Sequence, residues 1–436
     1  MAVPSNTLQN VQTYQKADMA WMLNSFCALN IANKKFENFQ NLTANLGDTV
    51  TFDLAPRYVS YDGLIITNQP STQRVQTLVC SQSANVASAF TAQQLIFNVD
   101  EYIDRFGMSG AKELGTRIEA DILLNAVSGM RSQTTGNFYT DSGPVRFYGD
   151  GVTPINSYGQ LAQAVSDFVE VGAAKDNMRA ILPQLSIPAI INTGLNQFAM
   201  TRNNDIAYDW ELGRFADTDW YTSNLLPTHT AGTIGNSGNP NNIMTVVSTN
   251  DPSGQNITQI TFTEPRGATE TGAIKSGDMF EFVDGVSGFD NMRALTFIGH
   301  KITGASVQFR AIADANSSAG TVTVTLTAQS QNGGLVSAPI ATQNINQNIQ
   351  AGMQVRVIPS HKAGLLMSGN PLYVALPRLP DEPPYPTSSE VDEDSGISIR
   401  HYYGALFGQN NRSYVRDAIW GATLVPENCM RICLPV

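Results

Sequence analysis

The clearest helical pattern in the chain lies between residues 109 and 127. Apolar side chains recur there at three- and four-residue steps, which places them on one face of a helix: Ala111, Leu114, Ile118, Ile122 and Ala126. The remaining positions are mostly charged or polar and are expected on the exposed face: Lys112, Glu113, Thr116, Arg117, Glu119 and Asp121. Ser109 suits the N-cap, and the Ser-Gly pair at 128–129 suits the helix end.

Shorter patterns surround this helix. A second helix is expected over 157–172, where Leu161, Val165 and Phe168 share a face. Alternating residues predict a strand at 49–54, and a two-limbed hairpin with a polar tip at 68–72 is expected within 57–93. Short buried strands are expected at 179–183 and 189–192, and an amphipathic helix is expected within 11–26.

The pattern changes after residue 230, where a Gly- and Asn-rich linker begins. Short alternating runs separated by turn residues predict a small β-barrel or sandwich, with strands at 243–248, 257–263, 279–283, 306–311 and 321–328. Mixed strands follow, and the apolar C-terminal residues are expected to lie inside a sheet. The sequence therefore predicts an α+β chain with an all-β domain placed inside it.

Composition narrows the classes of function. Charged residues make up 14% of the 436 residues, and the net charge is −11. A chain this acidic is not suited to gripping nucleic acid, because phosphate binding needs clustered Lys and Arg. No apolar run reaches the roughly 18 residues of a membrane span, and the first residues lack a signal-peptide pattern, so neither feature is expected.

Reactive side chains are sparse. The four cysteines are too few for a disulfide scaffold, so buried free thiols are expected, with a disulfide or a metal at Cys429 and Cys433 left open. The four histidines stand far apart in the sequence without a catalytic motif. We expect no enzyme activity, cofactor or metal. An aromatic and acidic stretch at 208–221 leaves sugar binding open as an alternative to ordinary packing.

Three short patterns, in this order, carry a resemblance to a known family. They are Ala111-x-x-Leu114-x-x-x-Ile118-Glu119, Gly-Asp-Met-Phe-Glu-Phe at 277–282 followed by 295–307, and Asn-Ile-Asn-Gln-Asn-Ile at 344–349 with Met-Gln-Val-Arg-Val-Ile at 353–358. Because these patterns occur in this order, the chain resembles the major capsid (coat) proteins of short-tailed bacteriophages of the Salmonella type. That family has a Hong Kong 97-like fold with an inserted β-barrel domain.

The resemblance implies a division of the chain into segments. They are an N-terminal arm (1–46), an extended loop and a strand leading to the spine (47–98), a spine helix with the peripheral domain (99–155), the first part of the axial domain (156–230), the inserted barrel (231–349) and the axial and peripheral return (350–436). We assign no counterpart in the family to the Pro-rich stretch at 377–386.

The resemblance also implies a function. Hexamers and pentamers would close into an icosahedral shell around double-stranded DNA, which they enclose without sequence-specific binding. The protein would be located in the virion capsid, which would be assembled in the host cytoplasm. Implied partners are other copies of the chain, a scaffolding protein, a portal complex and decoration proteins. By position, the candidates for contacts between subunits are Arg57, Asp62, Arg74, Glu113 and Arg117.

Two other classes of function stay open. An encapsulin-like nanocompartment would share the fold but carry protein cargo, and the β pattern at 231–349 argues against it. A β-rich extracellular binding module or adhesin would not assemble into a shell, and the aromatic stretch at 208–221 is its support. The kind of cargo and the size of the particle distinguish these classes.

Overall fold

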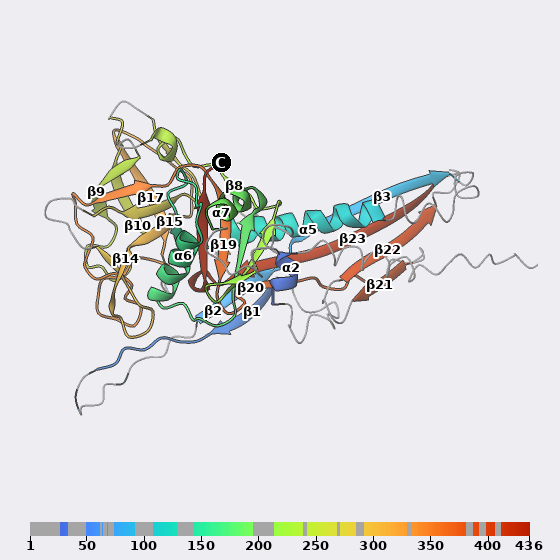
Figure 1. The fold of residues 1–436 in the computed structure, drawn as a ribbon, viewed down its shortest axis with the longest axis horizontal. Helices are drawn as coiled ribbons and strands as arrows, with labels where there is room; N and C mark the ends of the chain where they lie inside the picture. The colour runs from blue at the N-terminus through green and yellow to red at the C-terminus, as the bar shows by residue number, and fades with distance from the viewer. Residues whose placement is uncertain are drawn as a thin grey trace, which may run out of the picture. The chain divides into compact units, whose positions relative to one another are not determined.

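The computed structural model describes residues 27–33, 49–61, 63, 68, 74–91, 108–128, 143–194, 213–238, 242–267, 271–284, 292–328, 333–380, 387–391, 398–405 and 411–436. The chain forms two compact units (Figure 1). The first combines 1–51, 77–123 and 372–423, and the second combines 52–76, 124–371 and 424–436. The helix expected within 11–26 and the hairpin tip beyond residue 68 lie outside the described residues.

In the first unit, the long helix α5 (Met108–Ser128) lies alongside strands β3 (Gln82–Thr91) and β23 (Asn411–Leu424), as Figure 1 shows. All five residues of its predicted apolar face are buried, which confirms that prediction. Strand β23 pairs with β3 over ten consecutive residues, from Asn411 with Thr91 to Trp420 with Gln82. The same sheet contains β20 (Leu372–Ala375), β22 (Ser398–Ala405) and β21 (Thr387–Val391).

The predicted polar face of α5 is wrong at two positions. Glu119 and Asp121 are only 1% and 5% exposed. The Glu119 carboxylate accepts the backbone N–H groups of Cys27, Ala28 and Leu29 at 3.1, 2.5 and 3.2 Å. These groups begin the short helix α2 (Ala28–Ile31), where no other helical carbonyl can accept them. These three hydrogen bonds to a segment far away in the sequence explain why the Glu119 carboxylate is buried.

The strand predicted at 49–54 and the second limb of the predicted hairpin both form strands, whereas the described residues 57–61 of the first limb do not. β1 (Thr49–Leu54) and β2 (Arg74–Val79) pair in a two-stranded sheet, and neither pairs with a third strand among the described residues. An isolated ribbon of this kind is marginally stable in water.

The second unit contains a seven-stranded sheet. Its strands in order are β4 (Arg146–Tyr148), β24 (Cys429–Leu434), β19 (His361–Met367), β5 (Met178–Pro183), β7 (Thr218–Ser223) and β6 (Arg214–Phe215), with β8 (Thr228–His229) also on β19. All six residues of β24 are buried, which confirms that the C-terminal run lies inside a sheet as far as Leu434, whereas Val436 is 82% exposed. Cys429 and Cys433 are buried free thiols as predicted, whereas Cys27 and Cys80 are free and half-buried.

Two helices accompany this sheet. Helix α6 (Tyr158–Glu170) is confirmed, and the Ser157 side chain caps it by accepting the Gln160 N–H. The strand predicted at 189–192 is wrong, because these residues belong to helix α7 (Ile187–Gly194), which follows a 3-10 turn (Gln184–Ser186). Ile187 and Ile190 are both fully buried at helical spacing, whereas a short apolar run alone does not distinguish a helix from a strand.

The inserted β region forms a closed barrel. Its described strands are β9 (Ile243–Thr249), β10 (Gln259–Thr263), β12 (Met279–Phe282), β15 (Gln308–Ala311), β17 (Thr321–Thr327) and β18 (Gln354–Val357). Phe262, Phe280 and Phe309 stack in its core with ring planes 3° to 6° apart. Five strands match the predicted runs. β18 lies past residue 349, and it closes the barrel by pairing with both β12 and β9.

Smaller elements complete the second unit. They are the strand pairs β11 (Ala273–Ile274) with β16 (Ala315–Asn316) and β13 (Arg293–Leu295) with β14 (Ile302–Ser306), and the 3-10 turns Gly235–Ser237 and Pro426–Asn428. The division into arm, loop, spine, axial and peripheral segments stays a prediction.

Candidate functional site

The described part of the chain has no cluster of three or more His, Cys, Asp or Glu side chains that could hold a metal ion. Among the described residues, no helix is both long and apolar enough to cross a membrane.

Arg57 lies in an extended segment and is held within its own chain. Its guanidinium is 2.7 Å from the Glu427 carboxylate, and the two side chains are 8% and 14% exposed. The same guanidinium lies over the Phe297 ring, 4.8 Å from its centroid. Arg57 thus links the segment at 55–61 to Glu427 and to the turn between β13 and β14, which contains Phe297. A role for Arg57 between subunits stays a prediction.

The other predicted contact residues differ in their settings. Glu113 is exposed on α5. Arg117, whose side chain is 61% exposed, lies 3.5 Å from the Asp121 carboxylate one turn later. Arg74 begins β2, and Asp62 lies outside the described residues. Among the described residues, no hydrogen bond or ion pair joins Glu113 or Arg117 of α5 to Arg57 or Arg74. Each residue therefore stays a separate prediction of a contact between subunits.

Four large apolar side chains in the segments that contain Arg57 and Phe297 are exposed, and no sequence pattern singled them out. Tyr58 and Tyr61 are 55% and 54% exposed, and Ile298 and Ile302 are 87% and 68% exposed. Arg57 and Phe297, which touch, are the chain neighbours of Tyr58 and Ile298. Single exposed apolar side chains are common on protein surfaces, whereas a contiguous apolar patch marks a site of protein–protein contact.

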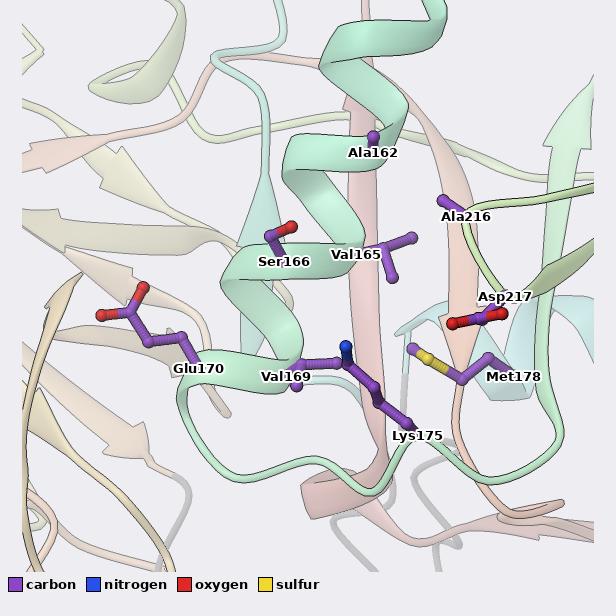
Figure 2. Close-up of a pocket in the computed structure, with 9 residues that line it drawn as sticks. All are labelled: Ala162, Val165, Ser166, Val169, Glu170, Lys175, Met178, Ala216 and Asp217. Atoms are coloured by element: carbon purple, nitrogen blue, oxygen red, sulfur yellow. The ribbon is translucent and has the colours of Figure 1, made fainter.

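A groove of about 430 Å³ lies beside α6 (Figure 2). Ala162, Val165 and Val169 of the helix form one wall, and Ala216 and Asp217 of the β6–β7 turn face them. Ala216 and Asp217 both have positive φ angles, 50° and 58°, as a tight two-residue hairpin turn requires. The groove is mainly apolar, and the polar side chains of Ser166, Glu170, Lys175 and Asp217 also line it.

The aromatic stretch predicted at 208–221 is described from residue 213 onward. Trp220 is 6% exposed, and its Nε1–H donates to the Phe215 carbonyl at 3.1 Å. Tyr158 packs edge-on against Phe215, with ring centroids 5.1 Å apart. These rings belong to the core of the second unit, so Trp220 is not available to stack on a sugar.

The fold brings together two histidines that stand far apart in the sequence. His229 on β8 and His361 on β19 are paired in register, and their ring centroids lie 5.3 Å apart. Burial and the nearby Arg431 charge lower the pKa of His361 to about 3. His229 donates to the fully buried Asp278 carboxylate at 2.7 Å. Sequence spacing gives no signal for this cluster, because four separate elements build it.

No family model matches the sequence, and no curated protein matches it. Several solved structures are similar. One described as "Mycobacterium phage Che8" is 9% identical with a TM-score of 0.42, and the match covers 93% of this chain and 90% of that chain. "Capsid of Ralstonia phage GP4" is 9% identical with a TM-score of 0.41, covering 94% and 88%. "Capsid structure of the Cyanophage P-SCSP1u" is 10% identical with a TM-score of 0.40, covering 92% and 88%. Likenesses of this strength do not assign a fold.

Proposed function

We propose that this chain is the major capsid protein of a tailed bacteriophage, with a Hong Kong 97-like fold. Its copies assemble as hexamers and pentamers into an icosahedral shell that encloses double-stranded DNA in the virion. The role is structural and needs no enzyme activity or cofactor.

The order of elements carries the proposal. A hairpin, a long helix, a sheet, an inserted barrel and returning strands follow one another in the order of the short-tailed phage coat proteins that the sequence resembles. The barrel lies between β8 and β19, which pair with each other in the seven-stranded sheet. The insertion thus leaves one strand of that sheet and returns to its neighbour.

Unpartnered surface supports self-assembly. The β1–β2 ribbon has no third strand among the described residues, and Ile298 and Ile302 expose most of their side chains. In a closed symmetric shell one interface is repeated many times, so each contact can be weak. The net charge of −11 fits a shell that surrounds DNA without binding it tightly.

The proposed partners follow from the same resemblance. They are further copies of the chain, a scaffolding protein, a portal complex and decoration proteins, with assembly in the host cytoplasm. Glu113 and Arg117 on the exposed face of α5 are proposed contacts between subunits, together with Arg57, Asp62 and Arg74 of the loop segment.

Sedimentation velocity of the expressed chain, alone and with its scaffolding protein, tests the proposal. We expect a fast-sedimenting species of narrow size distribution. Charge reversal at Arg117 is expected to reduce that species and leave the monomer folded, whereas the same change at the exposed Lys175, which follows α6, serves as a matched control for lost positive charge. A chain that stays monomeric under all conditions contradicts the proposal.

The content of the particles separates the two shell functions. Particles isolated from infected cells are expected to hold double-stranded DNA. Particles that hold a folded enzyme and no nucleic acid would support the encapsulin-like alternative instead.

A further inference from the structure

A buried charged junction joins the barrel to the seven-stranded sheet within the second unit. Four side chains from four places in the chain meet there: His229 on β8, Asp278 in the turn before β12, His361 on β19 and Arg431 on β24. Asp278, His361 and Arg431 are all 0% exposed. We call these four residues the junction cluster.

Arg431 connects three elements of this unit. Its guanidinium donates to the Gly277 carbonyl at the barrel entry at 3.1 Å and to the Val127 carbonyl near the end of α5 at 2.6 Å. It also lies 3.4 Å from Nε2 of His361. On the other side of the turn, Asp278 accepts the N–H groups of Gly232 and Lys275 at 3.1 and 2.8 Å. The turn at 275–278 is thus held by charge on both sides.

An apolar contact lies next to the junction cluster. Met279 of the barrel packs with Phe147, Ile358 and Cys433, and all four are nearly or fully buried. Cys433 is therefore inaccessible while the barrel sits on the sheet. Cys429, at the other end of β24, is equally buried but does not belong to this contact.

The junction cluster holds His361 neutral. The groups that face it or its neighbours are Arg431 from β24, His229 from β8, Asp278 from the barrel turn, Arg310 from β15 and Asp150 beside Gly151. The pKa of His361 falls to about 3 because burial disfavours its charged form and Arg431 repels a second positive charge. In an opened junction His361 would meet water and return toward its ordinary pKa near 6.5.

We propose that the junction cluster is an acid-sensitive clasp, which lets the barrel separate from the sheet locally while both remain folded. Protonation of exposed His361 below about pH 6.5 favours the open form, because the closed form cannot accept the proton. The closed form dominates at neutral pH. The inference concerns a motion within one chain and does not depend on the proposed shell function.

The two buried cysteines make the clasp measurable in the unmodified full chain. The reagent is a pyridyl disulfide, which still reacts with thiols in weak acid, and peptide mass spectrometry reports each cysteine separately. Rates are divided by that of an unstructured cysteine peptide at the same pH. With a pKa of about 3 closed and near 6.5 open, labelling of Cys433 should rise about 25-fold from pH 7 to pH 5.

Labelling of Cys429 should stay unchanged over this range. In His361→Gln the pH-dependent rise at Cys433 should disappear, since glutamine does not titrate. His300→Gln, which removes a half-buried histidine outside the cluster, should keep the full rise. The proposal is overturned if Cys433 shows no rise, if Cys429 rises in parallel with it, or if the rise persists in His361→Gln. If His361→Gln does not fold, the pH dependence of the labelling rates of Cys433 and Cys429 in the wild type still tests the proposal.

Discussion

Replacing Glu119 with glutamine removes the charge that caps α2. The carboxylate accepts three backbone N–H groups at 2.5 to 3.2 Å in a buried setting. A hydrogen bond to a charged group contributes about 1.5–3 kcal/mol, and a buried donor left without an acceptor costs about 1–3 kcal/mol. The glutamine carboxamide keeps one acceptor oxygen but turns an NH2 group toward the same donors. We expect Glu119→Gln to lower the free energy of unfolding by about 3 kcal/mol.

The matched control is Glu113→Gln, the same chemical change on the exposed surface of the same helix. Its expected effect is within about 0.5 kcal/mol, as for most surface substitutions. Urea unfolding of the full chain, followed by circular dichroism, measures both, and hydrogen exchange at Ala28 and Leu29 locates the change. Equal unfolding free energies for the two variants would refute the cap, because that is the result expected if Glu119 lay on an exposed face.

Two further predictions concern buried positions. Ile118→Asp places a carboxylate at a fully buried site of α5, and we expect it to abolish soluble yield on expression; soluble yield equal to wild type would contradict the packing of this face. Burial and the Arg416 charge lower the pKa of His401 to about 3. Neutral His401 therefore contributes its full share to the free energy of unfolding above about pH 6.5. This contribution declines at lower pH, by about 2 kcal/mol at pH 5, because only the unfolded chain takes up the proton there. Urea unfolding at pH 7 and pH 5 should show His401→Gln losing about 2 kcal/mol less than wild type, and an equal loss in both would rule this out.

Elements with a full amphipathic period could be predicted from the sequence. The apolar face of α5 and the N-cap Ser157 of α6 follow from local spacing and hydrogen bonding, which need no distant partner. The alternating residues of β17 likewise point alternately into the barrel and outward. In each case one segment of the chain contains the whole signal.

Features built by distant segments could not be predicted. Glu119 is buried because α2, some ninety residues earlier, lacks acceptors for its N–H groups. His229 and His361 become neighbours only because β8 and β19 pair on either side of the barrel. β18 is short, and only its pairing with β9 and β12 identifies it as a barrel strand. Long-range pairing of this kind leaves no periodic pattern in the sequence.

Electron microscopy of the assembled material tests the central claim most directly. Chain expressed with its scaffolding protein should give closed particles of uniform diameter whose averaged images show pentamers at fivefold vertices and hexamers at local sixfold positions between them. Particles of this kind contain both pentamers and hexamers of the chain, as proposed. Isolated monomers, open filaments or aggregates without fivefold vertices, under every condition of assembly, would contradict the account.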